Sequence, residues 1–184
     1  MPIGLVSGKL TAHGRRFHEP HRRGAGFSKP GISFKDLTPI LASPQAFHES
    51  VREIAGWYAG KRISTVVAAE ARGFLWAGPL GLALRAGVVP VRKPRKLPRE
   101  TVSATYQLEY GTDELHMHRD AVKPGDRVLI FDDVLATGGT AKAMVDLVTQ
   151  LGGQVVSLAF IVELTGLNGR AKLAPHDVRA LASY

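Results

Sequence analysis

Short apolar runs alternate along the chain with segments of helical periodicity. The runs at 63–69 (ISTVVAA), 88–91 (VVPV) and 128–131 (VLIF) contain few polar positions, which is typical of strands buried on both faces of a parallel sheet. A longer run of the same kind, QVVSLAFIVEL, begins at residue 154. Strands that alternate with helices predict an α/β fold in which a central, mainly parallel sheet is flanked by helices.

Three other segments have the pattern of helices. The first is predicted from Ser43, a suitable N-cap, through Pro44 to Gly60, because apolar residues recur there every three or four positions. Helices are also predicted within the segments LWAGPLGLALRAG (75–87) and TAKAMVDLVTQLGG (140–153). Each of these segments follows one of the apolar runs or precedes one, as the alternation of an α/β fold requires.

Composition limits the class of protein. The chain has 184 residues, of which 45% are apolar, so it can bury a core, and its length favours one soluble domain. No apolar run approaches the ~18 residues of a membrane span, and the N-terminus lacks the charged-then-apolar order of a signal peptide. Because the sequence has no cysteine, disulfides and thiolate metal sites are excluded, which fits a reducing compartment. We therefore expect a cytoplasmic protein without a membrane partner.

The net charge of +8 is unevenly distributed. Residues 1–26 contain five Lys or Arg and one Glu among Gly, His and Pro, without an apolar period, so we expect a disordered basic arm. A second basic cluster, RKPRKLPRE at 92–100, fits either an exposed loop or a site for an anionic ligand. Beyond it, residues 101–118 alternate polar and apolar positions, which predicts a less buried hairpin with its turn at 111–113.

Two adjacent carboxylates, Asp132 and Asp133, directly follow the apolar run at 128–131. Parallel sheets bind ligands beyond the carboxyl ends of their strands, so the pair stands where a ligand is expected. Neighbouring side chains on a strand point to opposite faces, so both can serve one ligand only if the chain is already leaving the strand. Because two close carboxylates repel, they need a cation or hydroxyl donors, and a ribose diol has two such donors. The alternative is two solvated Asp side chains in a loop.

Small and hydroxyl-bearing residues come next, where the following helix is predicted to begin. They are Ala136, Thr137, Gly138, Gly139 and Thr140. Small residues let backbone amides converge on an anion, Thr hydroxyls add donors, and a helix N-terminus adds partial positive charge. This pattern predicts a phosphate site. It lacks the Lys and the spacing of a Walker A loop, which disfavours an ordinary nucleoside triphosphatase.

The stretch VLIFDDVLATGGT resembles the phosphoribosyl pyrophosphate binding motif of the type I phosphoribosyltransferases. Other segments resemble, in the same order, the adenine phosphoribosyltransferase family: KPGISFKDLTPIL (29–41), AAEARGFLWAGPLG (68–81), the stretch 92–140 and VELTGLNGRAKL (162–173). The similarity spans about residues 27–182. It implies the type I phosphoribosyltransferase fold with a flexible hood loop at 95–116, in one domain at 27–184 that the arm at 1–26 precedes.

The resemblance also implies a reaction. The 5-phosphoribosyl group of phosphoribosyl pyrophosphate would be transferred to N9 of adenine, giving AMP and pyrophosphate in purine salvage. Asp132 and Asp133 would hold the ribose hydroxyls, and Ala136 to Thr140 would hold the 5-phosphate. The family further implies a homodimer and a requirement for Mg²⁺, which would be held mainly by substrate oxygens and water rather than by protein ligands.

The segment EARGF would form the pyrophosphate loop. The family has a non-proline cis peptide there, which corresponds to the bond between Glu70 and Ala71, and Arg72 would face the pyrophosphate and assist its departure. Positive charge nearby also favours a departing anion, and it would come from Arg92, Lys93 and Lys96. The alternative for Arg72 is a surface ion pair.

Adenine would be bound by the loop GISFKD. Phe34 would stack on the purine, the Ser33 carbonyl would accept from the amino group and the Lys35 amide would donate to a ring nitrogen. Hypoxanthine presents the opposite pattern and would leave both groups unpaired. In the hood, Glu109 would exchange a proton with the purine N7 and Tyr110 would cover the site. The alternatives are a core position for Phe34 and a solvated Glu109.

Two other classes are compatible with parts of the sequence. A phosphoribosyltransferase with another base preference is disfavoured by the adenine-type loop and by the LEYG segment of the hood. The same fold serves as a sensing domain in transcriptional regulators and RNA-binding attenuators, and the basic arm fits a nucleic-acid partner. However, no helix-turn-helix fits in an arm so rich in Gly and Pro, so we do not expect nucleic-acid binding. Turnover of adenine discriminates between these classes.

Overall fold

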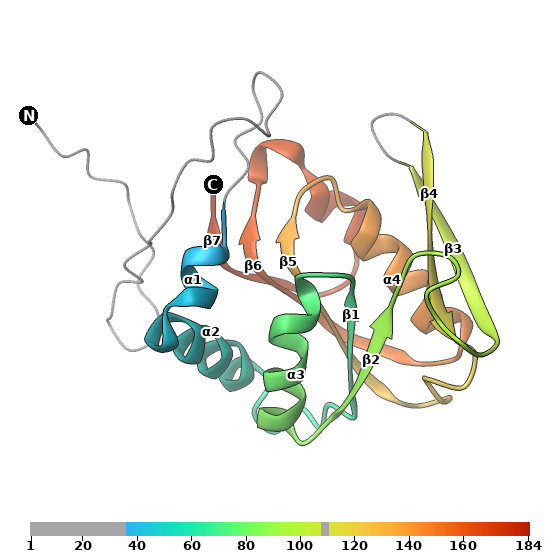
Figure 1. Ribbon diagram of the computed structural model, residues 1–184, viewed down its shortest axis with the longest axis horizontal. Helices are drawn as coiled ribbons and strands as arrows, with labels where there is room; N and C mark the ends of the chain where they lie inside the picture. The colour runs from blue at the N-terminus through green and yellow to red at the C-terminus, as the bar shows by residue number, and fades with distance from the viewer. Residues whose placement is uncertain (1–35, 108–110) are drawn as a thin grey trace, which may run out of the picture. The chain divides into compact units, whose positions relative to one another are not determined.

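The computed structural model describes residues 36–107 and 111–184 (Figure 1). In chain order the elements are α1 (Thr38–Ala42), α2 (Pro44–Trp57), β1 (Thr65–Ala69), α3 (Gly73–Leu84), β2 (Gly87–Val91), β3 (Thr101–Gln107), β4 (Thr112–His118), β5 (Arg127–Leu135), α4 (Gly139–Gln150), β6 (Gln154–Glu163), η1 (Thr165–Leu167), η2 (Gly169–Leu173) and β7 (Val178–Ser183). None of the described helices has the length and apolar character that crossing a membrane requires.

The chain divides into two units, and the boundary lies inside α2, after Ser50. The described part of the first unit consists of α1 and the beginning of α2. Ser43 is the N-cap of α2, as predicted, because its Oγ accepts a hydrogen bond from the amide of Ala46 at 3.2 Å. The helix ends at Trp57, slightly before the predicted end at Gly60. Gly60 has a φ of 74°, a conformation that favours glycine and ends the helical segment.

The second unit is built on a five-stranded sheet in the order β2-β1-β5-β6-β7, in which all neighbouring strands are parallel. Helix α3 contacts β1, β2 and β5, and α4 contacts β5 and β6. On β5, Ile130 belongs to a core cluster with Met144 of α4, whereas the Phe131 ring centroid lies 6.3 Å from that of Trp76 on α3. Because neighbouring side chains point to opposite faces, a helix covers each face of β5. The predicted parallel sheet flanked by helices is confirmed.

Strands β3 and β4 form a separate antiparallel hairpin, as predicted. The prediction that the turn spans 111–113 is wrong at its end, because Thr112 and Asp113 already belong to β4, where they pair with Gln107 and Tyr106. The hairpin is less buried than β1 and β5, as predicted, although Leu115 and Met117 are buried and both strands contact α4. A bridge between Arg92 and His116 joins the hairpin to the end of β2.

Two boundaries differ from the prediction in ways that affect the site. Helix α3 begins at Gly73, inside the EARGF segment that was expected to be a break before a helix at Leu75. Strand β5 continues to Leu135, although its apolar run ends at Phe131. The expectation that the chain leaves the strand at the carboxylates is therefore wrong. Pairing with β6 continues at these positions, where the carboxylates interrupt the apolar run but not the ladder.

Candidate active site

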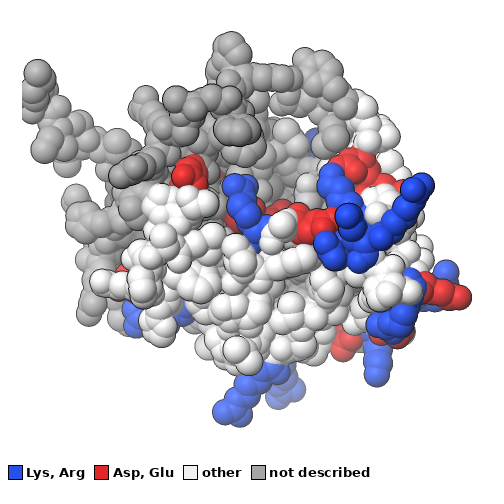
Figure 2. Space-filling model, viewed as in Figure 1, with Lys and Arg blue, Asp and Glu red and all other residues white. Residues whose placement is uncertain are grey.

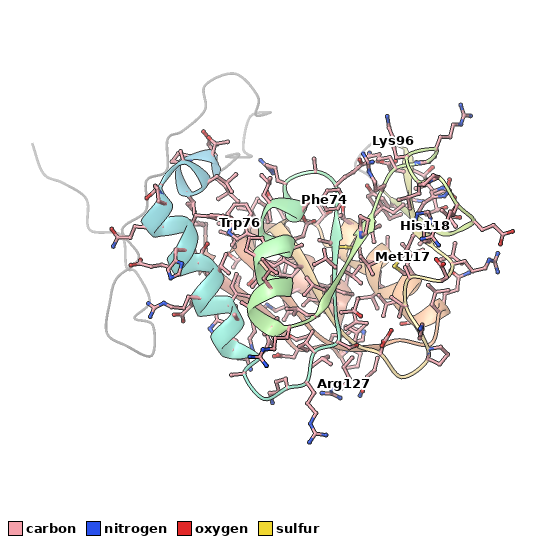
Figure 3. All side chains as sticks on the ribbon, turned by 60° about the horizontal axis from the view of Figure 1, so that its bottom comes forward. Phe74, Trp76, Lys96, Met117, His118 and Arg127 are labelled. Atoms are coloured by element: carbon pink, nitrogen blue, oxygen red, sulfur yellow. The ribbon has the colours of Figure 1, made fainter. Side chains whose placement is uncertain are left out.

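The predicted ligand-binding segments meet at one edge of the sheet. Asp132 and Asp133 lie near the carboxyl end of β5, and segment 136–140 follows that strand. Segment 70–72 follows the carboxyl end of β1, which pairs with β5 up to Ala68 and Phe131. Figure 2 shows acidic and basic side chains together in a band at this level of the molecule. In Figure 3, Lys96 lies at this end of the molecule and Arg127, at the start of β5, lies at the other.

The two carboxylates contact successive residues at the start of α3. The Nε of Arg72 lies 2.6 Å from Oδ2 of Asp133, whose side chain is only 8% exposed. A side chain at Gly73 would place its Cβ 3.1 Å from Oδ1 of Asp132, so only glycine leaves normal space there. The Oδ1 of Asp132 also accepts a hydrogen bond from the amide of Asp133 at 2.9 Å. Both carboxylates thus contact one turn although they are neighbours on a strand.

Burial opposes the charge of this pair. Burial first, and the neighbouring charge of Asp133 second, raise the pKa of Asp132 well above its ordinary value. Burial also raises the pKa of Asp133, although the cation of Arg72 acts in the opposite direction. In addition, Oδ2 of Asp133 is buried and, within the part of the chain that the structure describes, has the ion pair with Arg72 but accepts no hydrogen bond. A ligand that offers hydroxyl donors would satisfy that atom and stabilise the charged pair.

The predicted phosphate segment is a tight turn into α4. Gly138 is the N-cap of that helix and has a φ of 79°, which favours glycine. A Cβ at Gly138 would lie 2.4 Å from the carbonyl oxygen of Gly169, and a Cβ at Gly169 would lie 2.1 Å from that of Ala136. The turn therefore packs directly on the first residue of η2. Close backbone packing leaves its amides at a helix N-terminus, where an anion can bind.

Sequence reasoning assigned no role to Gly169 or to the ion pair beside it. Arg170 donates from Nε to Oε1 of Glu163 at 2.9 Å and from Nη1 to the carbonyl of Val178 at 2.6 Å. These contacts fix η2 to the ends of β6 and β7, and thus hold Gly169 against the phosphate segment. The motif VELTGLNGRAKL contains Glu163, Gly169 and Arg170. However, no local pattern indicates that Gly169 contacts the turn at 136–138, which is far away in the sequence.

The peptide bond between Glu70 and Ala71 is cis, as the resemblance implied. The Glu70 side chain accepts two hydrogen bonds at Oε2 from Arg92, at 3.0 Å from Nε and 2.8 Å from Nη2. Its Oε1 accepts from the amide of Lys93 at 2.6 Å. Burial raises the pKa of Glu70, but these hydrogen bonds from Lys93 and Arg92 outweigh it and leave the pKa below its ordinary value. Glu70 thus anchors the basic loop to the pyrophosphate segment, and Arg92 is neutralised rather than free.

The predicted pyrophosphate cations differ in their surroundings. The Nζ of Lys93 forms an ion pair with Oδ2 of Asp113 on β4. A hydrogen bond to Asp113, more than burial, determines the pKa of Lys93, which lies above its ordinary value. Lys96 is exposed, and its carbonyl accepts a hydrogen bond from Nη1 of Arg92 at 3.3 Å. The structure therefore brings Glu70, Arg92 and Lys93 together, whereas Arg72 is paired with Asp133.

The other predicted site residues lie outside the described residues. They are Ser33, Phe34 and Lys35 of the adenine loop and Glu109 and Tyr110 of the hood. Within 36–107 and 111–184, no group of three or more His, Cys, Asp or Glu side chains could hold a metal ion.

Comparison with known proteins defines the class. A family model described as phosphoribosyl transferase domain matches residues 39–180. The match includes both loops at the carboxyl edge of the sheet and every strand of the sheet except the end of β7. The architecture is that of the phosphoribosyltransferases.

Closer relatives narrow this class. The adenine phosphoribosyltransferase of Flavobacterium johnsoniae is 54% identical over 159 residues, which are 86% of this chain and 94% of that protein. The crystal structure of the enzyme of that name from Thermoanaerobacter pseudethanolicus has 50% identity and a TM-score of 0.86, and the match covers 89% of this chain and 95% of that one. The Saccharomyces cerevisiae adenine phosphoribosyltransferase, in complex with adenine and an imino-altritol bisphosphate, has 38% identity and a TM-score of 0.82 over 88% of this chain and 93% of that one. The chain belongs to the adenine phosphoribosyltransferase family of purine-salvage pentosyltransferases.

Proposed function

We propose that the protein transfers the 5-phosphoribosyl group of phosphoribosyl pyrophosphate to N9 of adenine. The bond between ribose C1 and the pyrophosphate oxygen breaks, the bond from N9 to C1 forms, and the products are AMP and pyrophosphate. The observation that carries the proposal is the pair of adjacent carboxylates on β5, the half-buried Asp132 and the buried Asp133, beside the glycine turn at the N-terminus of α4. The complex of the yeast relative with adenine supports the choice of base.

The ribose and its phosphate would bind along one edge. The ribose hydroxyls would donate to Asp132 and Asp133, which replaces the mutual repulsion of the carboxylates by charge-assisted hydrogen bonds. The 5-phosphate would accept from the amides and hydroxyls of segment 136–140. Since the two groups are joined in one substrate, their close spacing on the chain fits a single ligand.

Pyrophosphate would leave toward the cations that follow β1 and β2. Arg72, Lys93 and Lys96, with the amides around Glu70 and Ala71, would stabilise the charge that develops as the bond to C1 breaks. We propose that Mg²⁺ enters with the substrate, because phosphate oxygens and hydroxyls are the hard ligands that it prefers. When bound, the ion would neutralise part of the pyrophosphate charge. Arg72 would have to exchange its contact with Asp133 for one with the substrate.

The adenine side of the site is proposed from the sequence. Phe34 would stack on the base, Ser33 and Lys35 would read its edge through their backbone, and Glu109 would exchange a proton with N7. Tyr110 would cover the reacting atoms. These contacts would favour adenine over hypoxanthine because the opposite hydrogen-bond pattern leaves buried groups unpaired.

A homodimer would cover the apolar surface of α3. Leu75 and Leu82 on this helix are 49% and 84% exposed, and Val88 on the adjacent edge strand β2 is 43% exposed. The surface over α3 is largely uncharged (Figure 2). A second copy of the chain fits this face, because a twofold contact pairs like surfaces and most soluble oligomers are twofold dimers. Since α3 directly follows the pyrophosphate segment, the contact would also stiffen that segment.

We also propose that residues 27–184 form the phosphoribosyltransferase domain, that the arm at 1–26 lies outside it, and that the protein works in the cytoplasm without a nucleic-acid partner.

The test of the activity is an assay with phosphoribosyl pyrophosphate, Mg²⁺ and each of adenine, guanine, hypoxanthine and xanthine, with chromatography of the nucleotide products. We expect AMP from adenine and turnover of the other bases lower by at least about two orders of magnitude. Equal turnover of hypoxanthine, or no AMP from a folded protein, would refute the proposal.

A further inference from the structure

Asp113, near the start of β4, is the partner of a cation that the proposed reaction needs. Its Oδ2 forms an ion pair with Nζ of Lys93, and the Lys93 side chain is 50% exposed whereas that of Asp113 is 19% exposed. Sequence reasoning assigned Lys93 to pyrophosphate and gave Asp113 no role. Arg92, the neighbouring cation, is held by Glu70 through two hydrogen bonds. Lys93 is thus half-exposed and held through its side chain by a single carboxylate.

Asp113 does not depend on Lys93 for its hydrogen bonds. Its Oδ1 accepts from the amide of Glu114 at 2.9 Å, and its Oδ2 accepts from the hydroxyl of Tyr106 at 3.2 Å. If Lys93 moved away, the carboxylate would retain both donors and one side open to water. Release of the lysine would therefore not leave a buried, unpaired charge, which is the expensive outcome when an ion pair is broken.

Tyr106 fixes Asp113 relative to the phosphate segment. A Cβ added at Gly139 would lie 3.1 Å from Cδ2 of Tyr106, so the ring rests against that glycine. The Tyr106 hydroxyl also interacts with the Thr140 side chain. The carboxylate is therefore held at a defined place between the two segments that would bind the phosphates of the substrate.

From these contacts we propose that Asp113 is an internal anion that occupies Lys93 while no pyrophosphate is bound and releases it to pyrophosphate when the substrate arrives. The proposal rests on the proposed function. Asp113 is a positioning residue in this scheme, since it acts on the ligand through Lys93. It keeps the lysine charged and ordered in the empty site, and it competes with pyrophosphate for the same ammonium group, which weakens product binding and favours product release.

The test is the affinity of the full chain for pyrophosphate with Mg²⁺, measured by isothermal titration calorimetry. Asp113→Asn keeps the size of the side chain and its acceptor for Glu114 but removes the charge. We expect pyrophosphate to bind about fivefold more tightly to this variant, because a partly exposed ion pair contributes at most about that factor to an affinity. The gain should shrink at high salt, which screens the charges. A structural defect in the hairpin would weaken binding instead.

Two controls isolate the lysine. Asp120→Asn removes the same charge from the far end of the hairpin, where Asp120 pairs with Arg99, and should change the affinity less than twofold. In a Lys93→Met background, Asp113→Asn should have no further effect on the affinity for pyrophosphate, because Asp113 then has no ammonium group to withhold from the ligand. An affinity that is unchanged or lower in Asp113→Asn, or a gain that persists without Lys93, would overturn the inference.

The failure of this inference is distinguishable from failure of the proposed function. A wild-type protein that neither forms AMP nor binds pyrophosphate would refute the function itself, and with it the role of Lys93. A wild-type protein that forms AMP and binds pyrophosphate, but whose Asp113→Asn variant binds it no more tightly, would refute only the role of Asp113.

Discussion

The carboxylates at the end of β5 are residues whose environment favours a ligand over an empty site. Burial raises the pKa of both, the charge of Asp133 further opposes the ionisation of Asp132, and Oδ2 of Asp133 has an ion pair but no hydrogen bond among the described residues. Arg72 compensates in part, with its Nε 2.6 Å from Asp133. A substrate that brings hydroxyls would supply the missing donors. The same arrangement costs stability in the absence of that substrate.

Asp132→Asn should therefore stabilise the protein at neutral pH. The folded chain has the higher pKa at Asp132, so it binds the proton more tightly than the unfolded chain between about pH 3.9 and the raised value, and stability falls as pH rises through that window. Asn avoids this cost and still offers an oxygen to the amide of Asp133. We expect a melting temperature higher by about 2 to 4 °C at pH 7.5 and equal to that of the wild type near pH 4, measured by scanning calorimetry.

The control for this experiment is Asp146→Asn, which removes a carboxylate from the exposed pair with Lys142 on α4. It should change the melting temperature by less than about 2 °C. An Asp132→Asn variant less stable than the wild type at pH 7.5 would mean that the carboxylate is stabilising in the empty site.

At the scale of elements, the phosphate segment is shaped by a contact between two distant turns. Gly138 begins α4 with a positive φ, and Gly169 begins η2 close enough to touch the carbonyl of Ala136. The Arg170–Glu163 pair holds η2 in place. The geometry that would cradle the 5-phosphate thus depends on β6 and η2 as well as on the loop itself.

Gly169→Ala should impair use of phosphoribosyl pyrophosphate. The added Cβ would lie 2.1 Å from the carbonyl oxygen of Ala136 and 2.9 Å from the amide of Gly138, so backbone must move in the phosphate segment. We expect KM for this substrate to rise about tenfold or more, which corresponds to a loss of about 1.4 kcal/mol. Gly166→Ala in the preceding turn meets nothing within 4 Å and should leave KM unchanged. Equal effects of the two substitutions would show that Gly169 does not shape the site.

Periodicity and end signals were sufficient to predict most elements. The continuous apolar runs of β1, β2, β5 and β6 and the Ser43–Pro44 start of α2 reflect local chemistry, which the sequence carries directly. The pattern could not show that β5 continues to Leu135, because its ladder with β6 holds the strand through polar positions. It also missed β7.

The candidate site was predictable to the extent that its residues are neighbours in the sequence. Asp132, Asp133 and segment 136–140 stand together on the chain and in the structure. The contacts of Gly169, of Glu70 with Arg92 and of Lys93 with Asp113 join segments that are far apart, and no local rule couples them. Glu109 and Phe34 lie outside the described residues, and their roles stay predictions.

At the scale of the whole molecule, the exposed apolar face of α3 determines the proposed assembly. Leu82→Glu would place a charge in the centre of a twofold contact, where it would face its own copy and lose hydration. We expect this variant to be a monomer of about 20 kDa by light scattering, whereas the wild type and Leu82→Met are dimers. A wild type that is active as a monomer, or a Leu82→Glu variant that remains dimeric, would show that this face is not the interface.

The most direct test of the account is the binding of phosphoribosyl pyrophosphate to a protein without the carboxylate pair. Calorimetry with Mg²⁺ should show an affinity lower by at least about a hundredfold for Asp132→Asn/Asp133→Asn, because hydrogen bonds to charged acceptors each contribute about 1.5 to 3 kcal/mol. The matched control, Glu100→Gln/Asp120→Asn, removes two exposed carboxylates near the far end of the hairpin and should bind as the wild type does. An unchanged affinity in a folded Asp132→Asn/Asp133→Asn variant would contradict the assignment of this edge of the sheet to the ribose.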